Sequence, residues 1–183
     1  NSYAQNIKYA FKIIEYDIQG LLAISLFGKV LNTFQAAVIL YKYGLNSQSK
    51  MITRVQLESL FILKSIVKDK QNIDKLKKSI DKWRELLLKD INKNPYSVFN
   101  EFLGEDLIKE YEDLKEKNKR SDAILISPKE WAIESESYYE YFLTYNQLSK
   151  DIHLDLLNLE QYINFDDEGN VESFNIQPGT KDI

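Results

Sequence analysis

The sequence predicts an all-α protein: a multi-helix bundle with a small C-terminal β-hairpin. Glycine and proline are scarce, with 6 and 3 copies among 183 residues, and they fall where helices should end. Apolar residues recur at helical spacing along most of the chain, and strand-like patterning is confined to the tail. We expect five to seven helices in a single domain over 1–183, with the bundle over about 2–162 and the hairpin over about 162–176.

The first half of the bundle is predicted to begin with two helices. Ser2–Gln19 carries apolar residues at helical spacing, and Leu21–Tyr43 is apolar almost all round, which predicts a central, largely buried helix. Gly44 provides the left-handed residue that ends it. Gly20 lies between the two helices, either as a joint or as a tolerated interior glycine.

The next two helices have recognisable ends. Asn46 or Ser47 can cap a third helix that runs to about Lys68, and Asn72 can cap a fourth that ends at Asn94-Pro95. The fourth helix has a near-heptad apolar stripe that we expect to face the core, with Trp83 buried. This stripe consists of Ile73, Leu76, Ile80, Trp83, Leu87 and Ile91.

The second half begins with a charged amphipathic helix over Glu105–Lys119, whose charge run indicates a solvated face. Ser127-Pro128-Lys129-Glu130 then has the pattern of a helix start, with a capping box and proline at the first helical position. Trp131 follows and is expected to anchor this short helix in the core. A last long helix is predicted over Ser135–Tyr162.

The tail changes from helical to strand-like patterning. Tyr162–Phe165 and Val171–Ile176 are predicted strands on either side of the glycine-containing turn Asp166–Asn170. The acidic residues of this turn could suggest a calcium loop, but their spacing does not match an EF-hand and no helix follows. An exposed hairpin turn is the better interpretation.

Composition excludes several classes of site. The absence of cysteine excludes a disulfide framework, a thiolate zinc site and a cysteine nucleophile. His153 is the single histidine, so a site that needs two imidazoles from one chain is excluded as well. The chain has no phosphate loop, dinucleotide fingerprint or metalloprotease motif. We therefore expect no cofactor and no metal.

The same composition favours a cytoplasmic location and no membrane partner. The longest apolar stretch, Gly20–Tyr43, is interrupted by Lys29, Asn32, Gln35 and Lys42. The chain shows no secretory signal, and its lack of cysteine fits a reducing compartment. An excess of Lys over Arg, together with abundant Asn, suggests a bacterial source. Because the chain begins with Asn1 rather than Met, we expect it to be a processed or trimmed piece of its parent protein.

Two polar pairs interrupt apolar helices. Arg54 and Glu58 are four residues apart on the third helix, and Ser149 and His153 are four apart on the last, with Tyr145 one turn earlier. One interpretation is a surface ion pair of little energetic value and a structural histidine. The other is a preorganised polar pocket in which Arg54 holds an anion and His153 titrates near neutral pH.

The tyrosines, 12 in all, also need an explanation. Tyr138, Tyr139, Tyr141 and Tyr145 cluster on the last helix, and we expect them in the core or in a dimer interface rather than in a platform for stacking bases. The net charge of -4 disfavours nucleic acid as a partner. A homodimer through apolar helix faces is the partner that this pattern favours.

Two stretches resemble a known family. TRVQLESLFILKSIVKD at Thr53–Asp69 and YFLTYNQLSKDIH at Tyr141–His153 are similar to the bacterial domain family of unknown function DUF5677, over about Gly28–His153. Its members pair an Arg-x-x-x-Glu helix with a later Tyr…Leu-Ser-x-x-x-His helix in an α-helical domain. The resemblance implies a shared polar site, but it implies no activity. The matching residues are Arg54, Glu58, Tyr145, Ser149 and His153.

HEPN ribonucleases, which are dimeric helical bundles with an Arg-x4–6-His motif, offer the alternative. The positions where that arginine would precede His153 hold Leu148, Gln147 and Asn146, so the cation is missing from this helix. We therefore expect a binding or interaction module with an internal Arg/Glu/Ser/His pocket. The alternative is a HEPN-like, metal-independent ribonuclease or other hydrolase that uses His153 as acid/base, with Arg54 and Glu58 as further catalytic candidates.

Overall fold

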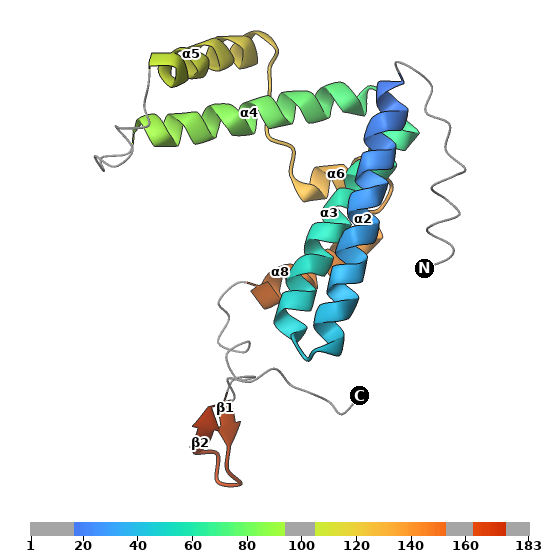
Figure 1. Cartoon of the computed structure of the whole chain (residues 1–183), viewed down its shortest axis with the longest axis vertical. Coiled ribbons are helices and arrows are strands. Elements are labelled where there is room, and N and C mark those ends of the chain that lie inside the picture. The colour runs from blue at the N-terminus through green and yellow to red at the C-terminus, as the bar shows by residue number, and fades with distance from the viewer. Residues whose placement is uncertain (1–16, 94–104, 153–162, 175–183) are drawn as a thin grey trace. The chain divides into compact units, whose positions relative to one another are not determined.

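The computed structural model describes residues 17–93, 105–152 and 163–174 (Figure 1). It confirms the all-α class with a small C-terminal hairpin. The chain divides into two compact units: unit 1 comprises Asn1–Lys68 and Trp131–Ile183, and unit 2 comprises Asp69–Glu130. The single domain over 1–183 stays a prediction. Most of the predicted first helix, Ser2–Gln19, lies outside the described residues.

Helix α2 spans Ile18–Lys42, so Gly20 lies inside its first turn. The side chain of Asp17 caps this helix by accepting a hydrogen bond from the Gly20 N–H at 3.0 Å. A Cβ atom at Gly20 would lie 2.4 Å from Asp17 Oδ2. The glycine therefore makes room for the capping carboxylate and is not a joint between two helices.

The far end of α2 follows the prediction, but its burial does not. Gly44 has φ of 73° and donates to the Tyr41 carbonyl, while Leu45 donates to the Leu40 carbonyl, which together form a Schellman ending. The prediction that this helix is largely buried is wrong, because Ala37 is its one buried residue among those described. Among the described residues, α3 is the one long helix that packs along α2, and it covers only one side of this apolar helix.

In the described part of the chain, α2 is the one helix long and apolar enough to cross a membrane, judged by length and composition alone. Three of its polar residues share one face. Ser25, Lys29 and Asn32 follow one another at helical spacing, and all are exposed. They form a polar stripe along the middle of the helix.

Helix α3, Asn46–Lys68, packs along α2 (Figure 1). Asn46 is its first residue, close to the predicted cap. The Ser49 hydroxyl donates to the Ala37 carbonyl at 2.8 Å near one end of the pair, and Gln19 Nε2 donates to the Ile66 carbonyl at 2.8 Å near the other. Phe61 and Ile66 are fully buried and form the centre of unit 1.

Helix α6, Pro128–Glu134, begins with the predicted capping box. The Ser127 N–H and hydroxyl both donate to the Glu130 carboxylate, at 2.6 and 2.7 Å, and the Glu130 N–H donates to the Ser127 hydroxyl at 3.3 Å. Hydrogen bonds from Ser127 hold the pKa of Glu130 below 4.5. Trp131 is buried as predicted, with 4% of its surface exposed.

The predicted last helix is divided into shorter segments. Helix α7, Tyr138–Glu140, leads into a π-helical turn, η2, over Tyr141–Tyr145, and α8 continues over Asn146–Ile152. The Asn146 N–H donates to the Tyr141 carbonyl, five residues earlier, which is the signature of the wider turn. Segments η2 and α8 both contact α3.

Unit 2 is built on helices α4, Asn72–Asn92, and α5, Glu105–Arg120, which pack against each other (Figure 1). The prediction that the apolar stripe of α4 faces the core is wrong for its middle. Trp83 is 58% exposed, and Ile80 and Leu87 are exposed as well. Ile73, the first residue of the stripe, is buried as predicted, and Leu88, which is not part of the stripe, is buried as well. The prediction that Trp83 is buried is therefore wrong.

A polar cluster lies between α4 and α5. Glu85 is 6% exposed and accepts hydrogen bonds from Lys82 and from Asn118 Nδ2, the latter at 2.9 Å. Asn118 Nδ2 also donates to the Asp81 carbonyl at 3.1 Å. Burial works against the charged form of Glu85, but the hydrogen bonds from Lys82 and Asn118 outweigh it, so its pKa lies below 4.5.

The hairpin has antiparallel strands β1, Ile163–Phe165, and β2, Val171–Phe174, with Ile163 opposite Phe174 and an irregularity after Asn164. The Asp166 side chain closes the turn by accepting from the N–H groups of Glu168 and Asn170 at 3.0 and 2.8 Å. These hydrogen bonds lower the pKa of Asp166. The acidic residues thus build an exposed turn, as predicted.

Candidate functional site

Tyr145 joins the two residues of the first polar pair. Arg54 Nε donates to the Tyr145 hydroxyl at 3.0 Å, and that hydroxyl donates to Glu58 Oε1 at 2.7 Å. Arg54 Nε also lies 3.4 Å from Glu58 Oε1, and its guanidinium carbon is 5.2 Å from the centre of the tyrosine ring. The guanidinium of Arg54 lies over the ring of Tyr145, and the tyrosine hydroxyl donates to the carboxylate of Glu58. Arg54 and Glu58 therefore each contact both the tyrosine and one another.

An aromatic wall supports this cluster. The rings of Tyr141 and Tyr145 stack with centroids 5.1 Å apart, and Phe61 lies 6.3 Å from Tyr145 and 6.5 Å from Tyr141. Tyr138 stacks on Tyr141 at 6.1 Å. Phe61 follows Glu58 on the same face of α3. One helix therefore supplies both the carboxylate that binds the Tyr145 hydroxyl and the phenyl ring that packs against the Tyr145 ring.

The π-helical turn decides which residues of the last segment face α3. A π-turn inserts one residue into the helical repeat, so the residues after it are rotated relative to those before it. Tyr141 begins this turn and Tyr145 ends it, and both rings lie against Phe61. Such turns are frequent at functional sites.

Tyr145 is buried, and this burial raises its pKa above 10.0; the hydrogen bond to Glu58 raises it further, while the bond from Arg54 opposes the shift. The tyrosine is therefore protonated at neutral pH, as its donation to Glu58 requires. Arg54 and Glu58 are only partly exposed, at 29% and 34% of their side-chain surface. The cluster lies at the edge of the bundle, where a solute can reach it.

Arg54 keeps unused binding capacity. Its Nε atom serves Tyr145, but none of the described residues accepts a hydrogen bond from its Nη atoms. A guanidinium group presents its N–H donors in a planar fork that matches a carboxylate or phosphate. The arrangement can therefore bind an oxyanion while Glu58 and Tyr145 hold the guanidinium in place.

The second predicted pair is only partly described. The Ser149 hydroxyl is buried on α8 and has no hydrogen-bond partner among the described residues. Buried hydroxyls usually have a partner, so this one leaves a hydrogen bond unmade among the described residues. His153 lies outside the described residues. Arg54, Glu58 and Tyr145 are thus brought together, and the placement of Ser149 and His153 beside them stays a prediction.

Sequence reasoning missed the other polar contacts of α3. Lys64 donates to the Ser137 hydroxyl, and Lys68 Nζ lies 2.6 Å from Glu136 Oε1. Arg54, Phe61 and Lys68 recur seven residues apart, a spacing that could have suggested one continuous contact face. No set of histidines and carboxylates able to hold a metal ion occurs within the described ranges.

The protein-family description that matches this chain is "Family of unknown function (DUF5677)", over residues 20–171. The match includes both helices of the Arg54–Tyr145–Glu58 cluster, and it extends beyond the resemblance expected from the sequence at both ends. No curated protein and no solved structure matches the chain. Because the match covers well over half of the sequence, the chain belongs to the DUF5677 family of unknown function.

Proposed function

We propose that this chain is a helical binding module whose Arg54–Tyr145–Glu58 cluster holds a small ligand that carries a carboxylate or a phosphate. The main support for this proposal is the hydrogen bonding of Arg54. Its Nε atom donates to Tyr145, while its Nη atoms donate to none of the described residues. A fixed guanidinium loses little freedom when it binds an anion, so preorganisation favours binding.

The neighbouring groups support this proposal. Glu58 keeps the site from being a simple anion trap, because its carboxylate neutralises Arg54 until a ligand arrives. The ring of Tyr141, which stacks on the buried Tyr145 and is itself partly exposed, gives an aromatic surface near the charged fork. A ligand with an anionic end and a small flat or aliphatic body would complement both features.

Binding is favoured over hydrolysis by the chemistry of the cluster. Tyr145 holds its proton firmly at neutral pH because its pKa is raised by burial, so it is a poor general base. The ribonuclease alternative depends on His153 with a cation from another helix. RNA cleavage that disappears in His153→Ala would replace the proposal by this alternative.

A cytoplasmic, bacterial protein with no membrane partner is part of the proposal. Lys29 lies in the middle of α2, and a lysine at the centre of a membrane helix costs about 2.5–3.5 kcal/mol on insertion scales. The exposed stripe that Lys29 shares with Ser25 and Asn32 suits contact with water. We propose that α2 lies on the surface of a helical bundle in an aqueous compartment.

Self-association through α2 completes the proposal. Phe34, Val38 and Tyr41 are exposed and recur at helical spacing, so they form an apolar stripe distinct from the polar one. We expect light scattering, measured as the protein elutes from a size-exclusion column, to give the mass of a dimer. Phe34→Glu should give a monomer mass, whereas Lys29→Glu on the polar stripe should leave the dimer intact; a monomer for the unmodified chain would contradict this.

The ligand proposal is tested with defined anions. Inorganic phosphate and succinate should each raise the melting temperature of the unmodified chain, because a ligand that binds only the folded state stabilises it. Arg54→Gln should abolish the increase. Arg84→Gln is the matched control, because Arg84 is an exposed arginine of α4 paired with Glu110, and it should keep the increase.

The outcomes separate specific from general anion effects. An equal increase in both variants would mean that the anions act by general salt effects, and it would overturn the proposal. The proposal would also be overturned if neither phosphate nor succinate raised the melting temperature of the unmodified chain. Tyr145→Phe should weaken the effect without abolishing it, because Glu58 still orients the guanidinium in that variant.

A further inference from the structure

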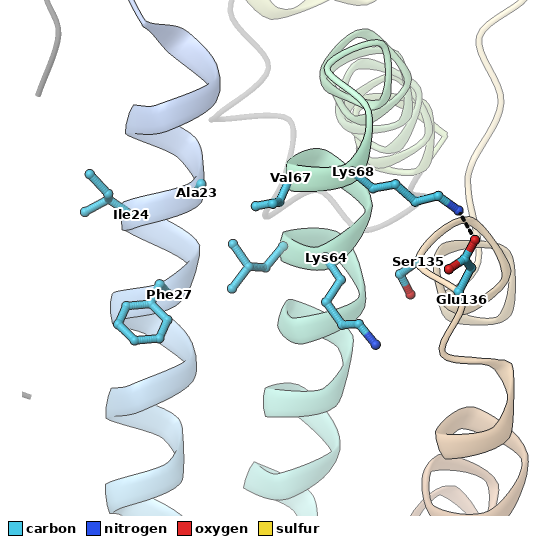
Figure 2. Close-up of a pocket in the computed structure, with 9 residues that line it drawn as sticks. Ala23, Ile24, Phe27, Lys64, Val67, Lys68, Ser135 and Glu136 are labelled. Carbon is cyan, nitrogen blue, oxygen red and sulfur yellow. Dashed lines mark hydrogen bonds and ion pairs between the residues drawn. The ribbon is translucent and has the colours of Figure 1, made fainter. Parts of the chain in front are cut away.

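A cavity of about 530 Å³ lies in unit 1, away from the Arg54–Tyr145–Glu58 cluster. It lies between α2, the end of α3 and the turn that follows α6 (Figure 2). Its volume is within the roughly 300–1,000 Å³ range of small-molecule pockets. The residues that line it are Ala23, Ile24, Phe27, Leu63, Lys64, Val67, Lys68, Ser135 and Glu136.

The walls of this cavity are apolar and come from two helices. Ala23, Ile24 and Phe27 are on α2, and Leu63 and Val67 are on α3. Figure 2 shows the α2 residues on one side and Val67 on the other. Apolar side chains on two neighbouring helices suit an unbranched hydrocarbon chain, which can lie along a groove of this kind.

The rim is charged and net positive, with two ammonium groups against one carboxylate. Lys68 Nζ binds Glu136 Oε1 at 2.6 Å, as the dashed line in Figure 2 shows. Lys64 has the neutral Ser137 hydroxyl as its hydrogen-bond partner. The hydrogen bond from Lys68 lowers the pKa of Glu136, and the charge of Lys64 adds to this effect. One positive charge is left to be balanced by a bound monoanion.

The backbone at Glu136 is a second, independent observation. Its φ is 56°, a left-handed conformation that favours glycine. Hydrogen bonds from the Glu136 N–H to the Ile133 carbonyl and from the Ser137 N–H to the Ala132 carbonyl make this the position after α6 where glycine is usual. A glutamate in this place fixes a carboxylate beside Lys68 at the cost of backbone strain, and such strain is commonly found at functional sites.

We propose that this cavity binds a free, single-chain, fatty-acid-type carboxylate. Its hydrocarbon tail lies along the apolar residues that α2 and α3 contribute to the cavity, and its carboxylate binds Lys64 at the rim. Glu136 pairs with Lys68 and fixes its position beside that carboxylate. Along α3, Lys64 lies about 15 Å from Arg54, so this site is separate from the anion site proposed above.

The test is titration calorimetry on the full chain with sodium decanoate. We expect decanoate to bind, and we expect octanoate to bind more weakly by about fourfold for each methylene lost. Decyltrimethylammonium, which has a tail of the same length and the opposite charge, should bind much more weakly. Equal binding of the two ten-carbon amphiphiles would overturn the proposal, because the cavity would then select for apolar surface alone. The absence of decanoate binding would also overturn it.

Variants place the binding in this cavity. Lys64→Met keeps the length of an exposed side chain and should weaken decanoate binding by about fivefold. Lys77→Met is the matched control on α4, where Lys77 is an exposed lysine paired with Asp74, and it should leave the affinity unchanged. Decanoate affinity that is the same in Lys64→Met as in the unmodified chain would contradict the assignment.

Two further variants test where the hydrocarbon tail binds and whether this site is distinct from the anion site at Arg54. Ala23→Trp should fill the cavity and abolish decanoate binding, and circular dichroism checks that this variant is folded. If Ala23→Trp does not fold, the decanoate affinity of Lys64→Met tests the proposal. Arg54→Gln should bind decanoate normally even though it loses the phosphate effect. Loss of decanoate binding in Arg54→Gln would show that the carboxylate sits at the other site, and it would overturn the proposal.

Discussion

The two units of this protein bury different chemistry between their helices. In unit 1, α3 contributes the fully buried Phe61 and Ile66, and the stacked rings of Tyr141 and Tyr145 lie against Phe61. In unit 2, the contact between α4 and α5 contains the buried pair Glu85 and Asn118. Apolar packing dominates the first contact, and a hydrogen-bonded polar cluster dominates the second.

This difference shows what a polar cluster adds to a helix pair. A buried ion pair adds little net stability, but it is costly to leave half of one unpaired. Glu85 is satisfied by Lys82 and Asn118, so it fixes how α4 and α5 meet rather than how strongly they adhere. In unit 1 the partly exposed Arg54–Tyr145–Glu58 cluster adds chemistry to a contact that the aromatic rings already stabilise.

The largest effect is expected from removing the centre of unit 1. Phe61→Ala should lower the free energy of unfolding by about 3–5 kcal/mol, because it removes a fully buried ring and leaves a cavity beneath Tyr145. Urea denaturation followed by circular dichroism measures it. Leu87→Ala, on the exposed stripe of α4, is the control and should cost much less. Equal losses would remove the contrast between the two units.

The next effect tests the polar contact of unit 2. Glu85→Ala should cost about 1–3 kcal/mol, because it removes one of the two acceptors of Asn118 Nδ2 and the carboxylate partner of Lys82. Asp74→Ala, which removes an exposed carboxylate from the same helix, should change the unfolding curve little. If the two variants unfold alike, the buried cluster does not hold α4 to α5.

The pH dependence of this effect has a defined sign. The pKa of Glu85 in the folded chain lies below its ordinary 4.5, so its contribution to stability is present above that pH and is lost as the pH falls through the folded pKa. The melting-temperature difference between the unmodified chain and Glu85→Gln should therefore shrink in acid. A difference that stays constant down to the acid limit would show that the charge of Glu85 is not stabilised.

A smaller effect is expected at the candidate site. Tyr145→Phe keeps the ring stacked on Tyr141 but removes the bridge between Arg54 and Glu58, so it should cost about 1–2 kcal/mol. Because burial raises the folded pKa of Tyr145, its contribution is complete below pH 10.0 and is lost as the pH rises through the folded value. The stability difference between the two chains should decrease in alkali, and an increase there would contradict the assignment.

The smallest effect is expected from the exposed tryptophan. Trp83→Phe should leave the stability within about 0.5 kcal/mol of the unmodified chain, because surface changes of this kind rarely cost more. Tryptophan fluorescence reports directly that Trp83 is exposed and Trp131 is buried. Trp131 alone, in Trp83→Phe, should emit at short wavelength, and Trp83 alone, in Trp131→Phe, should emit as a water-exposed indole. Similar emission from both variants would mean that the indole of Trp83 is covered in solution.

Local chemistry let the sequence alone determine most helix ends and the first polar pair. The capping box of Ser127 and Glu130, the left-handed Gly44 and the hairpin turn at Asp166 all depend on neighbours a few residues away. Arg54 and Glu58 share a face for the same reason, since a spacing of four residues fixes it in any α-helix.

Only the tertiary structure decided which faces are covered. The apolar stripe of α4 predicts a helix correctly, but the contact with α5 buries Glu85 instead of Trp83. The π-helical turn that ends at Tyr145 follows no local sequence rule, yet with it the tyrosine hydroxyl comes between Arg54 and Glu58. Periodicity gives each helix its faces, whereas the choice among those faces depends on contacts between residues as much as 91 positions apart.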